Sequence, residues 1–98
     1  MTKLSLNIEN SFGRERKFKL SPSTLFPDID NFTSSVELSF ITQDGSAIYY
    51  TLDGSVPSIL KTKYTAPFII NSTTIIKWIN ILSPYTSSNI MTRTITKI

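Results

Sequence analysis

The residues best suited to chemistry lie together at positions 48–58, in the string IYYTLDGSVPS. Its tyrosines, its serines and the carboxylate of Asp53 could bind a polar ligand or take part in acid catalysis. The rest of the chain offers few partners for such chemistry, because it contains no histidine, no cysteine and only 7 Asp and Glu residues. We therefore predict that the protein is not an enzyme and has no catalytic, cofactor-binding or metal-binding residues.

The same string predicts a strand that ends in a tight turn. Residues 47–52 alternate between two faces, one of which carries Ile48, Tyr50 and Leu52. An Asp-Gly pair then supplies the positive-φ position that a tight turn needs, and a proline prevents the strand from continuing. We interpret the tyrosines as packing residues and the aspartate as a turn residue. This turn motif consists of Tyr49, Tyr50, Asp53, Gly54 and Pro57.

A second group of carboxylates, Asp28 and Asp30 in the string PDIDNF, could open a calcium-binding loop. Calcium takes about six to eight oxygen ligands, and the downstream Gly and Glu of the known calcium loop are missing. We interpret these aspartates as part of a loop.

The densest charge lies at positions 14–19, in a chain of net charge +3 and pI near 9.3. The segment is either a solvated edge strand, whose charge discourages sheet pairing, or an arm that docks on a neighbouring subunit or an acidic surface. The aromatic residues interleaved with the charges are Phe12 and Phe18, too few to favour nucleic-acid binding. As a partner interface we predict the cations Arg14, Arg16, Lys17 and Lys19.

Alternation of period two runs through most of the chain, and no stretch shows a helical period. We expect loops at residues 21–31 and 55–66, and a hairpin turn at residues 43–46. Short strands between regular turn signals predict an all-β sandwich or small barrel. The predicted strands cover residues 4–9, 14–20, 36–41, 47–52, 68–70, 73–82 and 89–98.

The ordered strings VELSF (36–40), IYYTLDGSVPS, KYTAPFII (63–70) and STTIIKWI (72–79) resemble the chitobiase/β-hexosaminidase C-terminal module. That resemblance implies a fibronectin-III-associated, immunoglobulin-like antiparallel β-sandwich of about seven strands, which acts as an accessory domain without catalytic residues. The chain has Trp78 and Asn80 where the family tends to have alanines, a departure that concerns local packing and not the fold. We expect an N-terminal β-hairpin or arm over residues 1–20 and the sandwich module over residues 21–98.

The segment from Thr74 to Leu82 is apolar on both alternating faces, whereas a sandwich strand should have one wet face. The extra face requires a cover, and either the N-terminal arm or another chain could supply it. We therefore add three isoleucines to the predicted partner interface, namely Ile75, Ile79 and Ile81.

Aromatic side chains could instead stack on sugars, although core packing is the favoured interpretation of the single tryptophan. The residues of this alternative glycan platform are Trp78, Tyr49, Tyr64 and Tyr85.

The function expected from these features is non-catalytic and structural. A module standing alone, with its own Met1 and no signal peptide or membrane span, is typical of a small bacteriophage virion component such as a decoration, tail or fibre-attachment subunit. Such a protein would be made in the cytoplasm and assemble through contacts with itself or other virion proteins. The alternative is a carbohydrate-binding or spacer accessory module of a glycoside hydrolase, with a glycan as its partner.

Overall fold

The computed structural model describes residues 18–42 and 45–98. The predicted N-terminal arm lies outside these residues except for positions 18–20, and so do Arg14, Arg16 and Lys17.

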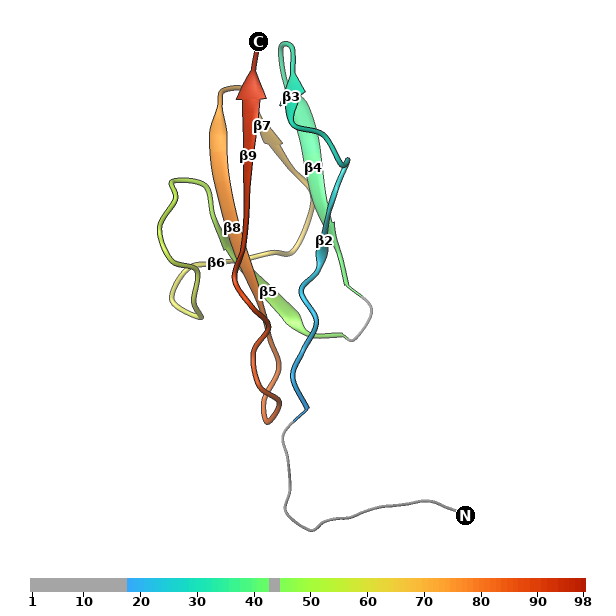
Figure 1. Cartoon of the computed structure of the whole chain (residues 1–98), viewed down its shortest axis with the longest axis vertical. Coiled ribbons are helices and arrows are strands. Elements are labelled where there is room, and N and C mark those ends of the chain that lie inside the picture. The colour runs from blue at the N-terminus through green and yellow to red at the C-terminus, as the bar shows by residue number, and fades with distance from the viewer. Residues whose placement is uncertain (1–17, 43–44) are drawn as a thin grey trace, which may run out of the picture.

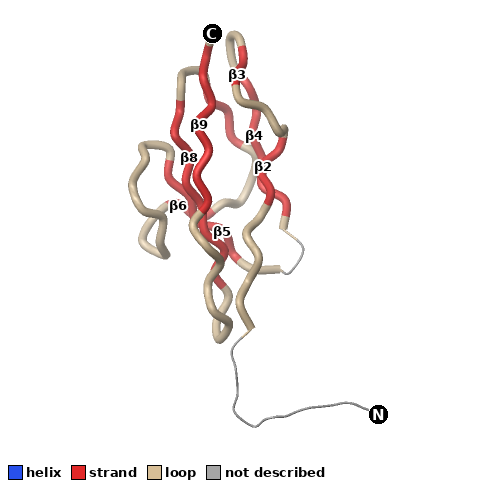
Figure 2. The backbone as a smooth tube through the Cα atoms, in the orientation of Figure 1, coloured by secondary structure: helices blue, strands red, loops and turns tan. Residues whose placement is uncertain are grey.

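All regular structure in the described residues is β-strand, arranged as two sheets that face each other (Figures 1 and 2). Neighbouring strands are antiparallel, apart from the short parallel pair β3–β9. The three-stranded sheet has the order β2 (Thr24–Phe26), β4 (Val36–Ile41), β7 (Phe68–Ile70). The five-stranded sheet has the order β3 (Asn31–Phe32), β9 (Met91–Lys97), β8 (Thr74–Ile81), β5 (Ala47–Thr51), β6 (Thr62–Lys63). The all-β sandwich predicted from the sequence is thereby confirmed.

The hairpin predicted at residues 43–46 is wrong. Strand β4 belongs to the three-stranded sheet and β5 to the five-stranded sheet, so the two strands do not pair. Residues 43 and 44 of the predicted turn lie outside the described residues. Gly45, the described glycine of this connection, has a φ of 74°, which suits a sharp change of direction. Two alternating runs on either side of a glycine look the same in sequence whether they pair with each other or join different sheets.

Two predicted loops contain short strands. Strand β2 lies within residues 21–31, where Leu25 pairs with Phe40 of β4, and β6 lies within residues 55–66, where Lys63 pairs with Tyr49 of β5. Strands this short contain too few residues for an alternating pattern to be recognised. By contrast, β4 and β7 have the predicted bounds, and β5, β8 and β9 lie inside predicted segments.

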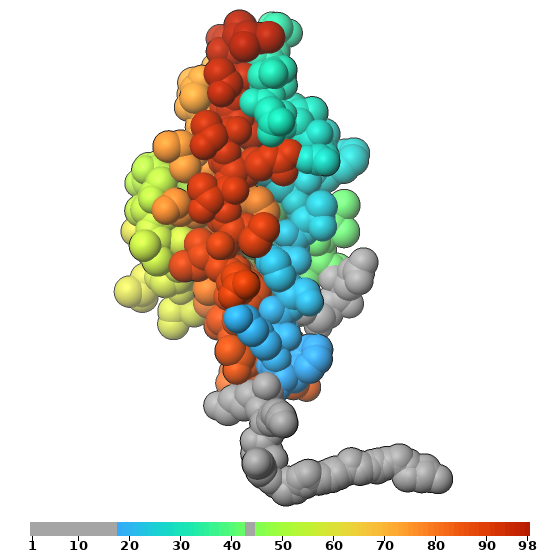
Figure 3. Space-filling model, viewed as in Figure 1, coloured from blue at the N-terminus to red at the C-terminus, as the bar shows by residue number. Residues whose placement is uncertain are grey.

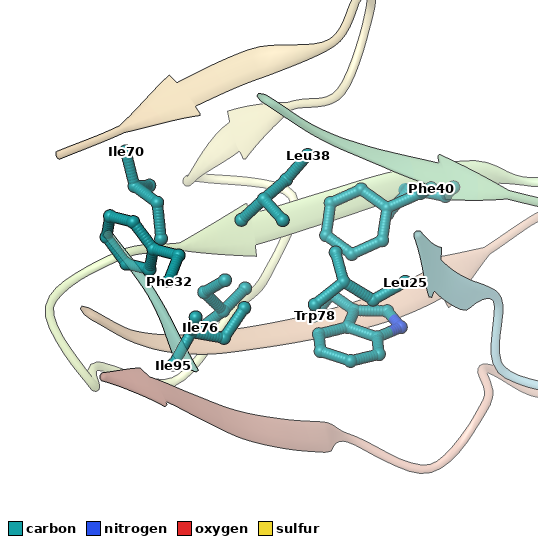
Figure 4. Close-up of a cluster of buried hydrophobic side chains, with 9 residues drawn as sticks. Leu25, Phe32, Leu38, Phe40, Ile70, Ile76, Trp78 and Ile95 are labelled. Atoms are coloured by element: carbon teal, nitrogen blue, oxygen red, sulfur yellow. The ribbon is translucent and has the colours of Figure 1, made fainter. Parts of the chain in front are cut away.

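The core is formed by side chains that point from both sheets into the space between them (Figure 4). Strand β8 shows the reason most clearly, because its residues alternate between buried and more exposed positions along its length. Phe40 lies at the centre of a ring cluster, with Trp78 at 5.1 Å and Tyr64 at 5.2 Å between ring centroids. The buried members of the core are Leu25, Phe32, Leu38, Phe40, Ile48, Ile70, Ile76, Trp78 and Ile95.

A buried polar cluster also joins the segment before β2 to strand β8. Asn80 is 0% exposed, and its side-chain amide donates to the hydroxyls of Ser23 (2.7 Å) and Ser46 (2.8 Å). Its carbonyl oxygen accepts a hydrogen bond from the backbone N–H of Ser23 at 2.9 Å. The indole N–H of Trp78 donates to the carbonyl oxygen of Ser23 at 3.0 Å. Ser23 is thus held through its N–H, its carbonyl and its hydroxyl by two side chains of β8, an arrangement that we call the Ser23 latch.

Candidate functional site

A groove lies beside the connection between β5 and β6, within and next to residues 48–58. Residues 52–61 of this connection form the yellow-green bulge on the flank of the five-stranded sheet (Figures 1 and 3). The groove has a volume of about 610 Å³. It is called the β5–β6 groove below, and its lining consists of Tyr50, Thr51, Leu52, Asp53, Ser55, Leu60, Lys61 and Thr62.

One wall of the groove is a turn built around Asp53. Its Oδ1 atom accepts hydrogen bonds from the Ser55 hydroxyl at 2.6 Å and from the Ser55 backbone N–H at 3.0 Å. The Thr51 hydroxyl donates to the Ser55 carbonyl oxygen at 2.7 Å, and Gly54 has a φ of 81°. The predicted proline of the motif, Pro57, is buried. The aspartate therefore fixes the shape of the loop and also lines the groove.

These hydrogen bonds stabilise the ionised form of the Asp53 carboxyl. The Ser55 hydroxyl, and after it the Ser55 N–H, stabilise the carboxylate and lower the pKa of Asp53 below its ordinary value, with a smaller contribution from the cation of Lys61. Asp53 is consequently ionised at neutral pH and acts as a hydrogen-bond acceptor only.

The opposite wall is a second turn, formed by residues 58–61. The Lys61 N–H donates to the Ser58 carbonyl oxygen at 2.9 Å, and the Leu60 N–H donates to the Ser58 hydroxyl at 3.1 Å. The chain then returns to the sheet, where the Tyr64 N–H donates to the Ile48 carbonyl oxygen at 2.7 Å. The Leu60 side chain at this wall is 88% exposed. The groove thus combines an acceptor, a cation, hydroxyls and exposed aliphatic surface.

Replacing Ser55 by alanine is expected to raise the pKa of Asp53 towards its ordinary value, because the largest stabilising contact of the carboxylate is removed. The measurement is a titration of the Asp53 side-chain carboxyl carbon by NMR. In the wild type the folded-state pKa lies below the unfolded one, so the ionised carboxylate favours folding above the unfolded pKa. That contribution is lost as the pH falls through the folded pKa.

The matched control is Ser58→Ala, a serine of the same loop whose hydroxyl contacts Leu60 and not Asp53. Its Asp53 carboxyl should titrate as in the wild type. An unchanged pKa of Asp53 in the Ser55→Ala variant would contradict this account of the turn.

The four aromatic residues of the alternative glycan platform do not come together. Trp78 is 3% exposed and lies in the core, as its favoured interpretation predicted. Tyr64 is half-buried against Phe40, and Tyr49 lies on the outer face of the five-stranded sheet opposite Ile79. Tyr85 follows β8, where its ring contacts that of Phe18, with 5.9 Å between centroids.

The described members of the predicted partner interface lie in two places. Ile75, Ile79 and Ile81 share the outer face of β8, where Ile75 is 43% exposed and the other two are half-buried. The ammonium group of Lys19 donates to the side-chain oxygen of Asn89 at 2.7 Å. The isoleucine face and the lysine are thus accessible to a partner. Their role as an interface stays a prediction.

The carboxylates of Asp28 and Asp30 are both occupied by Arg93 of β9. The guanidinium binds Asp28 through one terminal nitrogen and lies 3.4 Å from Asp30 through Nε. The hydrogen bond and charge of Asp28 raise the pKa of Arg93. Across residues 18–42 and 45–98, no group of three or more His, Cys, Asp or Glu side chains is placed to hold a metal ion. Nor does this part of the chain contain a helix long and apolar enough to span a membrane.

Leu60, Lys61 and Thr62 were not predicted as site residues, since they fall within the loop expected at residues 55–66. One signal was present, because Ile59 and Leu60 are adjacent large aliphatic residues within a predicted loop. Large aliphatic residues in an exposed loop often mark a contact surface.

The family described as Fn3 associated matches residues 36–95, which are more than half of the 98 residues. The chain belongs to this Fn3-associated family. The family is the module found at the C-terminus of chitobiase and hexosaminidase, which confirms the resemblance seen in the sequence. It is an accessory, non-catalytic module. No curated protein and no solved structure matches the chain.

The Fn3-associated match contains the whole β5–β6 groove and every strand from β4 to β8. Strands β2 and β3 lie before the match, which begins at Val36. The Ser23 latch joins a residue before the match to two residues within it.

Proposed function

We propose that this Fn3-associated chain is a non-catalytic accessory module of a glycoside hydrolase and that its role is to bind carbohydrate. The observation that carries the proposal is the family match over residues 36–95, because that family occurs attached to chitobiase and hexosaminidase. The β5–β6 groove lies within the matched segment and provides a place for a ligand.

The positions of the carboxylates support an accessory role. Glycosidases typically use two carboxylates that flank the scissile bond. In the described lining of the groove, Asp53 is the single carboxylate. Asp28 and Asp30 are engaged by Arg93, and Glu37 pairs with Ile69 in the other sheet.

The virion component expected from the sequence receives no support from the family match or from the described residues. The accessory-module alternative is better supported, since it accounts for the family without a further assumption about assembly.

The test is to incubate the purified chain with insoluble polysaccharides and, separately, with chromogenic glycosides. Retention on at least one polysaccharide without release of product is expected. Retention on none would contradict carbohydrate binding, and hydrolysis abolished by Asp53→Asn would contradict the non-catalytic part of the proposal. Bovine serum albumin serves as the control for nonspecific adsorption.

A further inference from the structure

We propose that the β5–β6 groove is the carbohydrate site and that it takes a neutral pyranose unit of a polysaccharide. This inference rests on the proposed function and assigns it to one surface of the molecule. The groove volume of about 610 Å³ lies within the range of about 300–1,000 Å³ that small-ligand sites commonly have.

The charges of the lining favour a neutral ligand. Asp53 supplies one negative charge and Lys61 one positive charge, and these are the ionised groups of the described lining. The two opposite charges offset each other, so the lining offers no net attraction to an anionic or a cationic sugar. A neutral polyol can satisfy both, because each hydroxyl can donate to a carboxylate and accept from an ammonium group.

The carboxylate of Asp53 can accept a further hydrogen bond from a ligand. Both hydrogen bonds from Ser55 reach Oδ1 of Asp53, so Ser55 leaves Oδ2 available as an acceptor. Hydrogen bonds to an ionised group are stronger than those between neutral groups. Tyr50 adds a phenol, which is protonated at neutral pH in any case and whose pKa is raised by burial and then by the neighbouring Tyr64.

The exposed aliphatic side chains at the rim of the groove suit the apolar faces of a sugar ring. A pyranose presents C–H groups on its ring faces, and these pack on apolar side chains. Leu60 is 88% exposed and Leu52 is 41% exposed, so both have apolar area to remove from water when a ligand binds. One face of the Tyr50 ring is already covered by Phe68, to which it is stacked at 4.7 Å.

Both walls are held in place before a ligand arrives. The Asp53 turn is fixed through Ser55 and Thr51, and the opposite turn is fixed through Ser58. A backbone bridge between Asp53 and Ile75 also ties the first wall to β8. Preformed walls lower the entropic cost of binding.

The experiment uses the full chain in affinity electrophoresis with soluble neutral polysaccharides, namely xylan, β-glucan and hydroxyethyl cellulose, and with polygalacturonate as an anionic comparison. The groove variants are Leu60→Ser and Lys61→Gln. The matched controls are Ile59→Ser and Lys63→Gln, since both residues are exposed, both lie within four positions of a groove variant, and neither lines the groove. All five proteins are first compared by thermal unfolding, because exposed substitutions should leave the fold intact.

Each groove variant is expected to bind a neutral polysaccharide about tenfold more weakly than the wild type, which corresponds to the loss of one hydrogen bond to a charged group or of one apolar contact. The controls should change affinity by less than about twofold. Equal binding by wild type and groove variants would overturn the groove assignment and leave the proposed function standing. Tighter binding to polygalacturonate than to the neutral chains would overturn the ligand class. Failure of the wild type on every polysaccharide would overturn the proposed function, and the groove assignment with it.

Discussion

Replacement of Asn80 by leucine is expected to reduce the free energy of unfolding by about 3 kcal/mol. Leucine has a similar volume but leaves the buried N–H and the buried hydroxyl of Ser23 without the amide that they contact. Buried donors and acceptors that lose their partners cost about 1–3 kcal/mol each. The hydrogen bonds from the Asn80 backbone should survive, because its N–H donates to Ser88 and its carbonyl oxygen accepts from the same residue.

The measurement is equilibrium unfolding in urea, followed by the fluorescence of the single tryptophan, Trp78. The matched control is Asn89→Leu, because Asn89 is exposed and its side chain accepts one hydrogen bond from Lys19. That control should change the free energy of unfolding by less than about 0.5 kcal/mol. If Asn80→Leu reduced the free energy of unfolding no more than the Asn89→Leu control does, the buried polar cluster would contribute no net stability.

The polar cluster illustrates which part of the fold the sequence could not predict. The alternation in residues 73–82 correctly predicts strand β8, although it does not choose between the two apolar faces. It says nothing of the partners of Asn80, because Ser23 lies 57 positions away and Ser46 lies 34 positions away. Such contacts depend on how the two sheets are stacked, which a local pattern does not encode.

Within the loop that forms the β5–β6 groove, one wall could be predicted from the sequence and the other could not. The turn at Asp53 could be predicted because its hydrogen bonds join residues only two positions apart, and the Asp-Gly pair is a local signal. The opposite wall at Leu60 could not be predicted, because its place depends on the pairing of β6 with β5. A strand of two residues leaves no alternating pattern from which that pairing could be read.

Replacement of Trp78 by alanine is expected to cause the largest loss of stability in the chain, about 4 kcal/mol. The indole is 3% exposed, and its ring lies 5.1 Å from that of Phe40 between centroids. Truncation leaves a cavity at the centre of the ring cluster and removes the N–H that donates to Ser23. The Trp78→Phe variant keeps most of the ring contact and loses the donor, so its expected loss is about 1–2 kcal/mol.

These variants lack the tryptophan, so unfolding in urea is followed by far-ultraviolet circular dichroism. Tyr85→Ala is the control, because Tyr85 is 45% exposed and contacts Phe18 at its edge. Its expected change is less than about 1 kcal/mol. A loss in Trp78→Ala no larger than this control would contradict the assignment of Trp78 to the core.

The two β8 substitutions should also be coupled through the Ser23 latch. Trp78 holds the carbonyl oxygen of Ser23, while Asn80 holds its N–H and hydroxyl. Once one side chain is replaced, the segment before β2 is held less firmly. Replacing the other side chain then reduces the free energy of unfolding by a smaller amount. The double variant Trp78→Phe/Asn80→Leu should therefore lose about 1 kcal/mol less than the sum of the single losses. Additive losses would mean that the two side chains stabilise the sandwich independently, with Ser23 as a shared neighbour rather than a link between them.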